Sequence, residues 1–414
     1  MGKNKVIIMG GGASGMMAAI IAARLGSKVT ILERCDRIGK KILATGNGRC
    51  NLTNTTVDES NYFIKEPHKG FVNQILDQFN VQTTLDFFHG LGIEIVEKED
   101  GKLYPRSDQA SSVLAVLMAE LEHLKVEILC NQTVQAVEVD KSIRVQTQDQ
   151  KFYCNKFVVA TGGKSTPELG SDGSGYTLAK ELGHTLTPVF PSLVQIKTDY
   201  PYLKHLKGTK IQGCARLHNE KKEVLQTEVG EILYTDYGIS GPPILQISRI
   251  ASDRIHQNLD TYVTIDLIPE IEIDELDLLL RSRFEQMPYK SAENILIGLI
   301  NSRLIVPMLK TAEVALSKKA ADFSKAERKN LCKAMKNACM KVTGINPWNQ
   351  SQVTAGGVAL SEVSKDLESR LKPNVYFCGE ILDVDGLCGG YNLQWAWSSG
   401  AVVGRQVSNT NSEA

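Results

Sequence analysis

Short motifs of the common metal and nucleophile sites are absent from this sequence. The nine cysteines include no C-x-x-C pair, the seven histidines show no ligand spacing, and no HExxH, Walker or Ser/His/Asp pattern occurs. Scattered cysteines in odd number indicate buried thiols, because a disulfide framework or a zinc site needs paired spacings. We therefore expect no metal site in this chain.

Long apolar runs are also missing. The first run ends at Gly10, and the most apolar later stretch, 295–309, is interrupted by Asn301 and Arg303 and is too short to span a bilayer. No secretory signal peptide is recognisable. With 414 residues, of which 42% are apolar and 23% charged, the chain has the composition of an ordinary globular enzyme of two or three domains. These features predict a cytoplasmic protein without membrane contact.

The N-terminal residues follow the order of strand, glycine turn and helix. Residues 5–9 form an apolar run that is typical of a buried parallel strand. This run leads directly into the spacing Gly10-x-Gly12-x-x-Gly15, and the small and apolar residues at 16–23 predict a helix behind it. A glycine turn between a strand and a helix is much stronger evidence for a dinucleotide site than the glycine spacing alone.

Each part of this pattern has a physical role. Gly10 permits a tight turn, Gly12 lets the backbone approach a pyrophosphate, and Gly15 allows close packing of helix on strand, while the helix N-terminus offers N–H groups to the phosphates. A second strand at 28–32 ends in Glu33, 18 residues after Gly15, close to the spacing of an acid that binds a ribose hydroxyl. The pattern indicates a dinucleotide and leaves NAD and FAD open.

Three later segments favour FAD. The strand and glycine turn at 157–163 resemble the Ala-Thr-Gly motif that two-dinucleotide-binding flavoproteins place near the FAD phosphates. The segment 374–380 resembles the one whose acid binds the ribityl chain, with Glu380 where Asp is usual. Gly389 and Gly390 then precede a helical stretch, whose N-terminus would stabilise negative charge on the pyrimidine edge of a reduced flavin.

Longer motifs carry a family resemblance. Gly39–Asn54, Leu382–Gly386 and Gly389–Ala396 resemble a family of bacterial flavoproteins whose members are described as aminoacetone-oxidase-like or as 3-dehydro-bile-acid reductases. That family has also been linked to reduction of uridine in ribosomal RNA. The resemblance runs nearly end to end and is weakest in the middle. It implies FAD, whereas the substrate stays open because the members differ in what they act on.

The motifs and the resemblance together predict the cofactor-binding positions. In related flavoproteins the backbone at the place of Val134 meets the adenine. The expected positions are Gly10, Gly12, Ala13, Ser14, Gly15, Glu33, Arg34, Lys40, Lys41, Asn47, Gly48, Arg49, Cys50, Asn51, Val134, Ala160, Thr161, Gly162, Gly163, Gly379, Glu380, Asp385, Gly389, Gly390, Tyr391, Asn392 and Leu393.

No catalytic residue is assigned from the sequence. Tyr391 could donate a proton, and Asn392 or Arg49 could anchor a substrate, but we favour binding FAD or holding loops as the role of all three. Cys50 and Cys388 fall in loops that the resemblance places near the flavin, where a small residue that packs closely is sufficient explanation.

The order of motifs predicts an interrupted domain. We expect an α/β fold, in which a Rossmann-like FAD-binding domain is interrupted by a β-barrel insert with a helical subdomain. Residues 1–191 and 347–414 would form the FAD-binding domain, 192–272 the barrel and 273–346 the helical part. The barrel follows from the resemblance, and the helical part also from apolar residues at helical spacing after 273.

Charge is unevenly distributed although the chain carries 47 basic and 47 acidic residues. Residues 310–341 contain nine basic and three acidic residues, a balance of +6, and 197–222 contain seven and two, a balance of +5. Such clusters are compatible with an RNA-facing surface, but we favour a solvated helical face with ordinary loop lysines as their explanation. RNA is therefore an open partner beside a small molecule.

These observations predict an FAD-dependent oxidoreductase. The main hypothesis is hydride transfer from reduced flavin to a C=C bond conjugated to a carbonyl in a small organic substrate, with NADH or NADPH as a transient reductant. The chain has no second GxGxxG for a nicotinamide domain. One alternative is reduction of uridine in ribosomal RNA, because uracil also contains a conjugated C=C bond. A second is an amine oxidase that uses oxygen.

Overall fold

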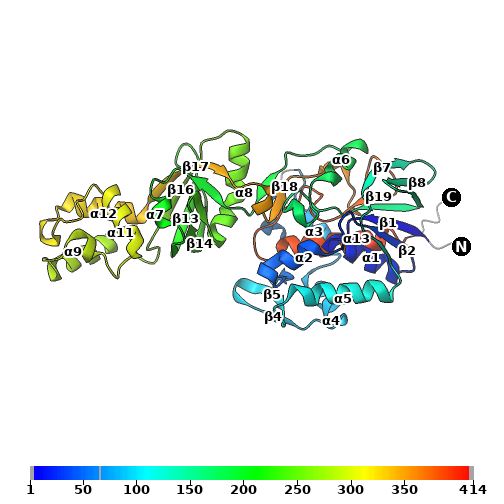
Figure 1. Ribbon diagram of the computed structural model, residues 1–414, viewed down its shortest axis with the longest axis horizontal. Coiled ribbons are helices and arrows are strands. Elements are labelled where there is room, and N and C mark those ends of the chain that lie inside the picture. Colours follow the sequence, from blue (N-terminus) through cyan, green and yellow to red (C-terminus); the bar gives the residue numbers. More distant parts are fainter. Residues whose placement is uncertain (1–3, 65–66, 410–414) are drawn as a thin grey trace. The chain divides into compact units, whose positions relative to one another are not determined.

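The structure is a computed structural model that describes residues 4–64 and 67–409 (Figure 1). Within this part, the chain divides into two compact units. The first is made of Met1–Phe190 and Gln352–Ala414, and the second of Pro191–Ser351. The chain passes from the first unit to the second along the short strand β11 (Phe190–Ser192). The predicted α/β fold with an inserted barrel is confirmed.

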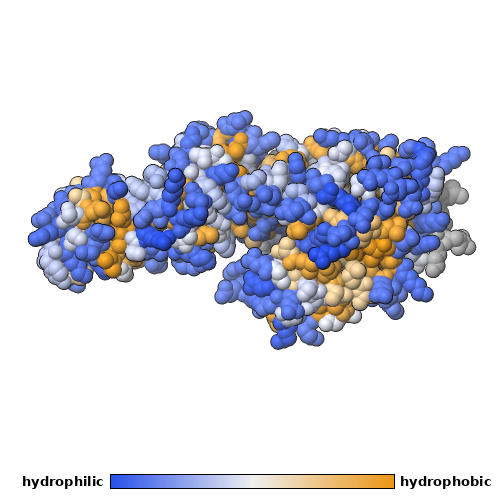
Figure 2. All heavy atoms as spheres, in the orientation of Figure 1, coloured by the Kyte–Doolittle hydropathy of each residue, from blue (hydrophilic) through white to orange (hydrophobic). Residues whose placement is uncertain are grey.

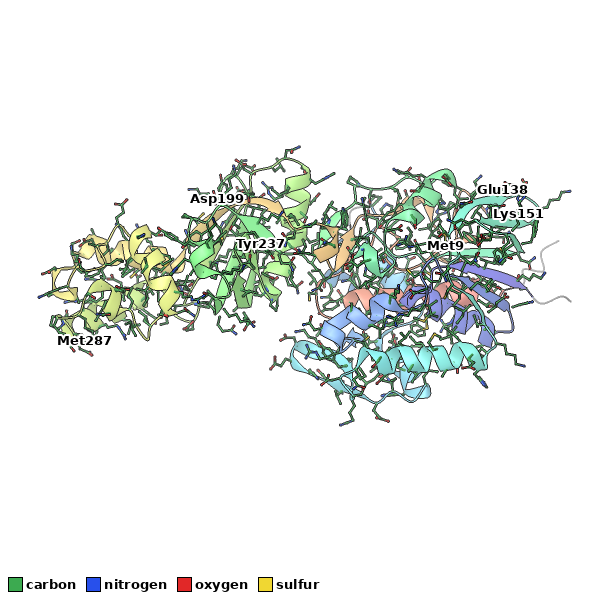
Figure 3. All side chains as sticks on the ribbon, viewed as in Figure 1. Met9, Glu138, Lys151, Asp199, Tyr237 and Met287 are labelled. Atoms are coloured by element: carbon green, nitrogen blue, oxygen red, sulfur yellow. The ribbon has the colours of Figure 1, made fainter. Side chains whose placement is uncertain are left out.

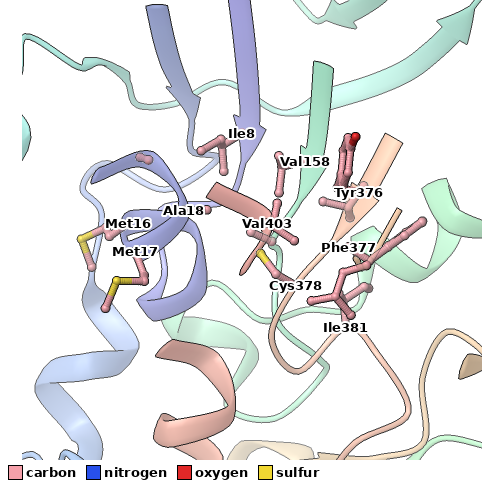
Figure 4. Close-up of a cluster of buried hydrophobic side chains, with 14 of the residues drawn as sticks. Ile8, Met16, Met17, Ala18, Val158, Tyr376, Phe377, Cys378, Ile381 and Val403 are labelled. Atoms are coloured by element: carbon pink, nitrogen blue, oxygen red, sulfur yellow. The ribbon is translucent and has the colours of Figure 1, made fainter. Parts of the chain in front are cut away.

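A parallel sheet forms the centre of the first unit. Its strand order is β19-β10-β1-β2-β6, and every neighbouring pair is parallel. The strands are β1 (Lys5–Met9), β2 (Lys28–Leu32), β6 (Glu127–Leu129), β10 (Lys156–Val159) and β19 (Val375–Phe377). The apolar runs of β1, β10 and β19 are almost fully buried, as expected for strands covered on both faces. Figure 4 shows part of this core.

Two helices pack closely against each other in this unit. They are α1 (Ala13–Arg24), which follows β1, and α13 (Tyr391–Gln406), the last helix described. A Cβ at Gly400 would stand 2.4 Å from the carbonyl oxygen of Ser14, and one at Gly404 would stand 2.7 Å from that of Ala18. Because these distances exclude any side chain, the two glycines let the C-terminal helix lie directly on the helix of the glycine turn.

Smaller elements complete the first unit. The strands β3 (Thr53–Asn54), β5 (Lys102–Pro105) and β4 (Ile95–Glu97) form one antiparallel sheet, and β7 (Val134–Val139), β8 (Ile143–Thr147) and β9 (Lys151–Cys154) form another. The remaining elements are α2 (Lys40–Ala44), α3 (Phe71–Leu76), α4 (Val81–Gly90), α5 (Ala110–His123), α6 (Ser174–Glu181) and β18 (Val353–Ala355).

The second unit contains a closed six-strand barrel and a group of helices. The barrel order is β12-β15-β14-β13-β16-β17. Its strands are β12 (Ile196–Thr198), β13 (Lys210–His218), β14 (Val224–Tyr234), β15 (Gly238–Ser240), β16 (Tyr262–Asp266) and β17 (Ala338–Ile345). Its helices are α7 (Leu203–Leu206), α8 (Pro242–His256), α9 (Ile273–Gln286), α10 (Ala292–Ile295), α11 (Ser302–Thr311) and α12 (Lys325–Lys336).

One expectation for this unit needs correction. The range 273–346, expected to be helical, also contains β17, which closes the barrel between β12 and β16. Its residues alternate between buried and more exposed positions, a strand pattern that follows directly on a lysine-rich helix.

Candidate cofactor-binding site

The glycine turn after β1 leaves an open position at Gly12. Figure 3 labels Met9, the last residue of β1, and the turn begins at Gly10 with φ +106°. A Cβ at Gly10 would stand 2.5 Å from the carbonyl oxygen of Ala160, and one at Gly15 would stand 2.0 Å from that of Gly10. Beside a Cβ at Gly12, by contrast, no heavy atom of the described residues lies within 4 Å. The backbone there can be approached by a ligand.

The helix that follows offers unused donors. Gly12 is the N-cap of α1, and within the described residues no side chain caps the helix. The first N–H groups of a helix have no partner inside it, and the helix dipole favours an anion there. The open backbone at Gly12 and this helix end together have the features of a phosphate-binding turn.

Glu33 orders the edge of this turn. One oxygen of its carboxylate accepts from the backbone N–H of Gly11 at 2.8 Å, and the other accepts from that of Cys35 at 2.8 Å. Each oxygen has a second lone pair for a ligand hydroxyl. The N–H of Gln132 donates to the backbone oxygen of Glu33 at 2.9 Å, which brings the segment leading to Val134 beside it.

The side chains of Arg34 and Lys40 are engaged within the protein. The Arg34 guanidinium contacts Asp172 at 2.6 Å and donates to the backbone oxygens of Pro167 and Gly170 at 3.3 and 3.2 Å. Lys40 lies 2.5 Å from Asp36. Both cations therefore order loops next to Glu33, and a direct role in cofactor binding stays a prediction.

Glu380 lies where the neighbouring strands β19, β10 and β1 end. A Cβ at Gly379 would stand 2.4 Å from the hydroxyl of Ser14, so this segment touches the first turn of α1. A Cβ at Gly163 would stand 3.1 Å from the Glu380 carboxylate. The carboxyl ends of parallel strands are the usual place for a ligand in such a sheet, and the predicted residues of all three strands meet there.

The Glu380 carboxylate has two partners in the protein. It accepts from the backbone N–H of Thr354 at 2.6 Å and forms an ion pair with the Lys41 amine at 2.9 Å. The Thr354 hydroxyl in turn accepts from the N–H of Lys164 at 2.7 Å. Sequence reasoning missed Thr354. Its signal was the short strand before Gly356 and Gly357, which repeats the strand and glycine pattern of the other cofactor segments.

The loop from Gly46 to Cys50 has an unusual backbone. Gly46, Asn47, Gly48 and Cys50 all have positive φ, and Arg49 lies between them with its guanidinium 5.2 Å from the centre of the Tyr104 ring. Such a conformation orients several backbone N–H groups. The thiol of Cys50 is fully buried, and burial raises its pKa to about 11. It therefore stays protonated at neutral pH, as a packing role requires.

The N-terminus of α13 is built from interlocking side chains. The Asn392 amide accepts from the N–H of Gly386 at 2.8 Å and donates to its oxygen at 2.9 Å. The Thr56 hydroxyl lies 3.0 Å from that of Tyr391 and donates to Asn54 at 2.8 Å. Because Thr56 has one hydroxyl proton, the Tyr391 hydroxyl donates to Thr56.

These contacts determine which groups remain for a ligand. The side chains of Tyr391 and Asn392 hold the loops around Gly386 and Asn54, while Leu393 is half-buried and Asp385 is fully buried. The first backbone N–H groups of α13 have no helical partner, and no side chain of the described part caps this helix. Burial also raises the pKa of Cys388, which makes its thiol a poor nucleophile.

The described residues contain neither a recognisable metal centre nor a helix that could span a membrane. Among them, no group of three or more His, Cys, Asp or Glu residues is arranged to hold a metal ion. Within the same ranges, no helix combines the length and apolar character needed to cross a membrane.

The sheet, its glycine turn and the inserted barrel define the class of protein. The first unit is a Rossmann-type FAD-binding domain, and the second unit, inserted into it in the sequence, contains the barrel and its helices. The chain belongs to the family described as HI0933-like protein Rossmann domain, whose model matches residues 4–406. The resemblance found in the sequence motifs is thereby confirmed.

Similar proteins cover nearly the whole chain. It is 41% identical to a 3-dehydro-bile acid delta(4,6)-reductase of Clostridium scindens, over 98% of this chain and 99% of that one. It is 31% identical to a ribosomal RNA dihydrouridine synthase of Haemophilus influenzae, over 97% and 98%. A solved 3-ketosteroid delta1-dehydrogenase from Sterolibacterium denitrificans covers 98% of this chain and 100% of its own, with 12% identity and a TM-score of 0.51, which shows a shared fold.

Proposed function

We propose that this protein is an FAD-dependent reductase of a C=C bond conjugated to a carbonyl in a small organic substrate. The observation that supports the cofactor is the meeting of the open turn at Gly12, the glycine turn after β10 and the acid Glu380 at the ends of three adjacent strands. The 41% identity to a 3-dehydro-bile acid delta(4,6)-reductase supports the substrate class.

The residues present fit FAD. The open backbone at Gly12 and the first turn of α1 would hold the pyrophosphate, and Glu33 would accept from a ribose hydroxyl, with Val134 near the adenine. Glu380 would accept from the ribityl chain. The N-terminus of α13 would face the pyrimidine edge of the flavin, where its dipole stabilises negative charge.

The chemistry divides between cofactor and protein. Bound FAD in its reduced form supplies a hydride, and the protein must orient the substrate, polarise its carbonyl and provide a proton. Tyr391 is not assigned as the proton donor, because its hydroxyl already donates to Thr56. The buried thiols are not assigned either. We leave the catalytic residue open and propose that NADH or NADPH is the reductant.

The ion pairs of the basic residues in 310–341 favour a small-molecule substrate over RNA. Lys318 forms an ion pair with Glu327 at 2.6 Å, and Arg328 forms one with Asp277 at 2.7 Å. Lys336 contacts the buried Asp266 at 2.8 Å. Glu327 is already counted in the sequence balance of +6, but Asp277 and Asp266 lie outside 310–341, so that balance overstates the charge offered to a phosphate backbone.

The surface around these helices is also mixed in character. Figure 2 shows apolar side chains among hydrophilic ones on the visible face of this region. On α9, Leu278 is 63% exposed and Leu279 is 38% exposed. Protein–DNA interfaces are more polar and much more positively charged than protein–protein interfaces, and exposed leucines do not contribute to such a surface.

The test begins with the purified protein as isolated. Acid release followed by chromatography should give FAD, without covalent attachment. Anaerobic mixing with NADH and with NADPH should bleach the flavin absorbance with at least one of them. A bile-acid enone should then restore the absorbance, whereas ribosomal RNA should not. Isolation of FMN, or recovery of oxidised flavin with RNA alone, would overturn the proposal.

A further inference from the structure

At the candidate site, one buried polar atom has no hydrogen-bond partner among the residues that the structure describes. Asn51 is 8% exposed, and among the described residues its Oδ1 has no hydrogen-bond partner. The neighbouring Asn54 is 1% exposed and fully used, because its amide accepts from Thr56 and donates to the oxygens of Gly389 and Asp100. A buried acceptor without a hydrogen bond destabilises a fold, and a donor on a bound ligand would remove that cost.

The chain around Asn51 is fixed against the N-terminus of α13. The indole N–H of Trp397 donates to the oxygen of Leu52 at 3.0 Å. A Cβ at Gly390, the N-cap of α13, would stand 2.6 Å from the carbonyl of Thr53. The residues that directly follow Asn51 therefore pack against the N-terminal part of α13. This packing fixes the position of Asn51 relative to the helix.

The other neighbour of Asn51 is the loop with positive φ. A Cβ at Gly46 would stand 3.0 Å from the backbone nitrogen of Asn51 and 3.8 Å from its Cβ. Asn51 thus lies between this loop and the end of α13. The unpartnered acceptor comes from its side chain, and the unused backbone donors come from the first turn of the helix.

We propose that Asn51 and the first turn of α13 together recognise the imide edge of the flavin pyrimidine ring. That edge presents an N–H donor between two carbonyl acceptors. The Oδ1 of Asn51 accepts from the N3–H, and the helix N–H groups donate to a flanking carbonyl. This inference rests on the proposed function, since it assumes that FAD is the cofactor, and it gives a role to a side-chain oxygen that has no hydrogen-bond partner among the described residues.

The test compares FAD with FAD methylated at N3, which lacks the imide proton. Apoprotein is titrated with each, and flavin fluorescence gives the two dissociation constants. The wild type should bind FAD about tenfold more tightly than the methylated form, as the loss of one hydrogen bond predicts. In Asn51→Leu, a nearly isosteric apolar change, the ratio should fall to about one.

Two variants serve as controls. Asn51→Asp keeps the acceptor, so it should keep the preference for unmethylated FAD, and its added negative charge should shift the flavin reduction potential to a more negative value. Asn54→Leu removes an amide with all its partners in the protein. It should lower the thermal midpoint of the apoprotein, whereas Asn51→Leu should leave that midpoint unchanged or raise it.

The outcomes separate this inference from the proposed function. FAD binding by the wild type, with the same preference retained in Asn51→Leu, would overturn the role of Asn51 and leave the reductase proposal intact. Equal binding of FAD and N3-methylated FAD by the wild type would also overturn the role of Asn51 and leave the reductase proposal intact. Failure of the wild type to bind FAD would overturn both proposals.

Discussion

At the residue scale, the glycines of the first turn differ in what the structure requires of them. Gly10 and Gly15 are needed by the fold, because a Cβ at either would collide with a backbone oxygen. Gly12 has an extended backbone with φ −82° and open space beside it. Only the ligand can demand a glycine there.

Gly12→Val should therefore fold and lose FAD. The added methyl groups occupy the space of a pyrophosphate, while no atom of the described residues lies near enough to be displaced. We expect a thermal midpoint of the apoprotein close to that of the wild type, with almost no flavin after gel filtration. Gly15→Val is the matched control, which should fail to fold. Full flavin content in the Gly12 variant would place the cofactor elsewhere.

Glu33 has both a structural and a binding role, so two variants are needed. Glu33→Ala removes the acceptor of the Gly11 and Cys35 N–H groups as well as that of a ribose hydroxyl. We expect the alanine variant to lose about 1–3 kcal/mol of stability and to bind FAD at least about tenfold more weakly. Glu33→Gln keeps one acceptor and should lose less of both. Isothermal titration and thermal melts check this, and wild-type values in both variants would contradict it.

His184 gives the first unit a pH-dependent stability. Its Nε2 lies 2.8 Å from the Ser369 hydroxyl and its Nδ1 lies 3.2 Å from Glu362. Burial lowers the pKa of His184 below its ordinary value of 6.5, although Glu362 acts in the opposite direction. The unfolded chain therefore binds a proton more readily than the folded one, and the stability held above pH 6.5 should fall as the pH drops below it. His184→Gln should flatten this part of the profile in chemical denaturation, and an unchanged slope would contradict the assignment.

At the scale of elements, α12 shows how a helix end and an ion pair act together. The Ser324 hydroxyl accepts from the backbone N–H of Glu327, and the Glu327 carboxylate accepts from the backbone N–H of Ser324. Lys318 forms an ion pair with the same carboxylate. The hydrogen bond from Lys318, together with those from Ser324, lowers the pKa of Glu327 to about 2. The cap therefore joins the segment before the helix to its first turn.

This cap predicts an acid-sensitive second unit. Because the pKa of Glu327 is lower in the folded chain than its ordinary value of 4.5, its contribution is complete above pH 4.5 and is lost as the pH falls toward 2. Glu327→Gln should remove that loss. Ser324→Ala should cost about 1 kcal/mol at neutral pH through the lost cap. Denaturation at several pH values checks both, and an acid profile of Glu327→Gln identical to the wild type would be inconsistent with this account.

At the scale of the whole molecule, local patterns were enough for the cofactor unit. The glycine turn, the strands around it and the end of α13 followed from residues close together in the sequence, and the inserted barrel followed from the resemblance. The sheet of β3, β5 and β4 was missed because its strands are short and pair across the chain. Thr354 was missed because it contacts Glu380 through its backbone N–H, a contact that the side-chain pattern does not reveal.

The basic cluster shows a second limit of sequence reasoning. Counting charge along 310–341 gave an excess, but part of that excess is paired with acids from elsewhere in the second unit. Asp277 lies on α9 and pairs with Arg328, and Asp266 ends β16 and pairs with Lys336. Such pairing is a tertiary property, and a single sequence shows only that both signs are present.

The most direct measurement of the central claim is the product of one anaerobic turnover. The protein is reduced with one equivalent of NADH or NADPH, mixed with a bile-acid enone, and quenched for mass spectrometry. The account predicts a product that has gained two hydrogens, has lost the conjugated C=C bond and retains its carbonyl, in an amount equal to the flavin. Recovery of unchanged enone, or of an alcohol with the C=C bond intact, would contradict it.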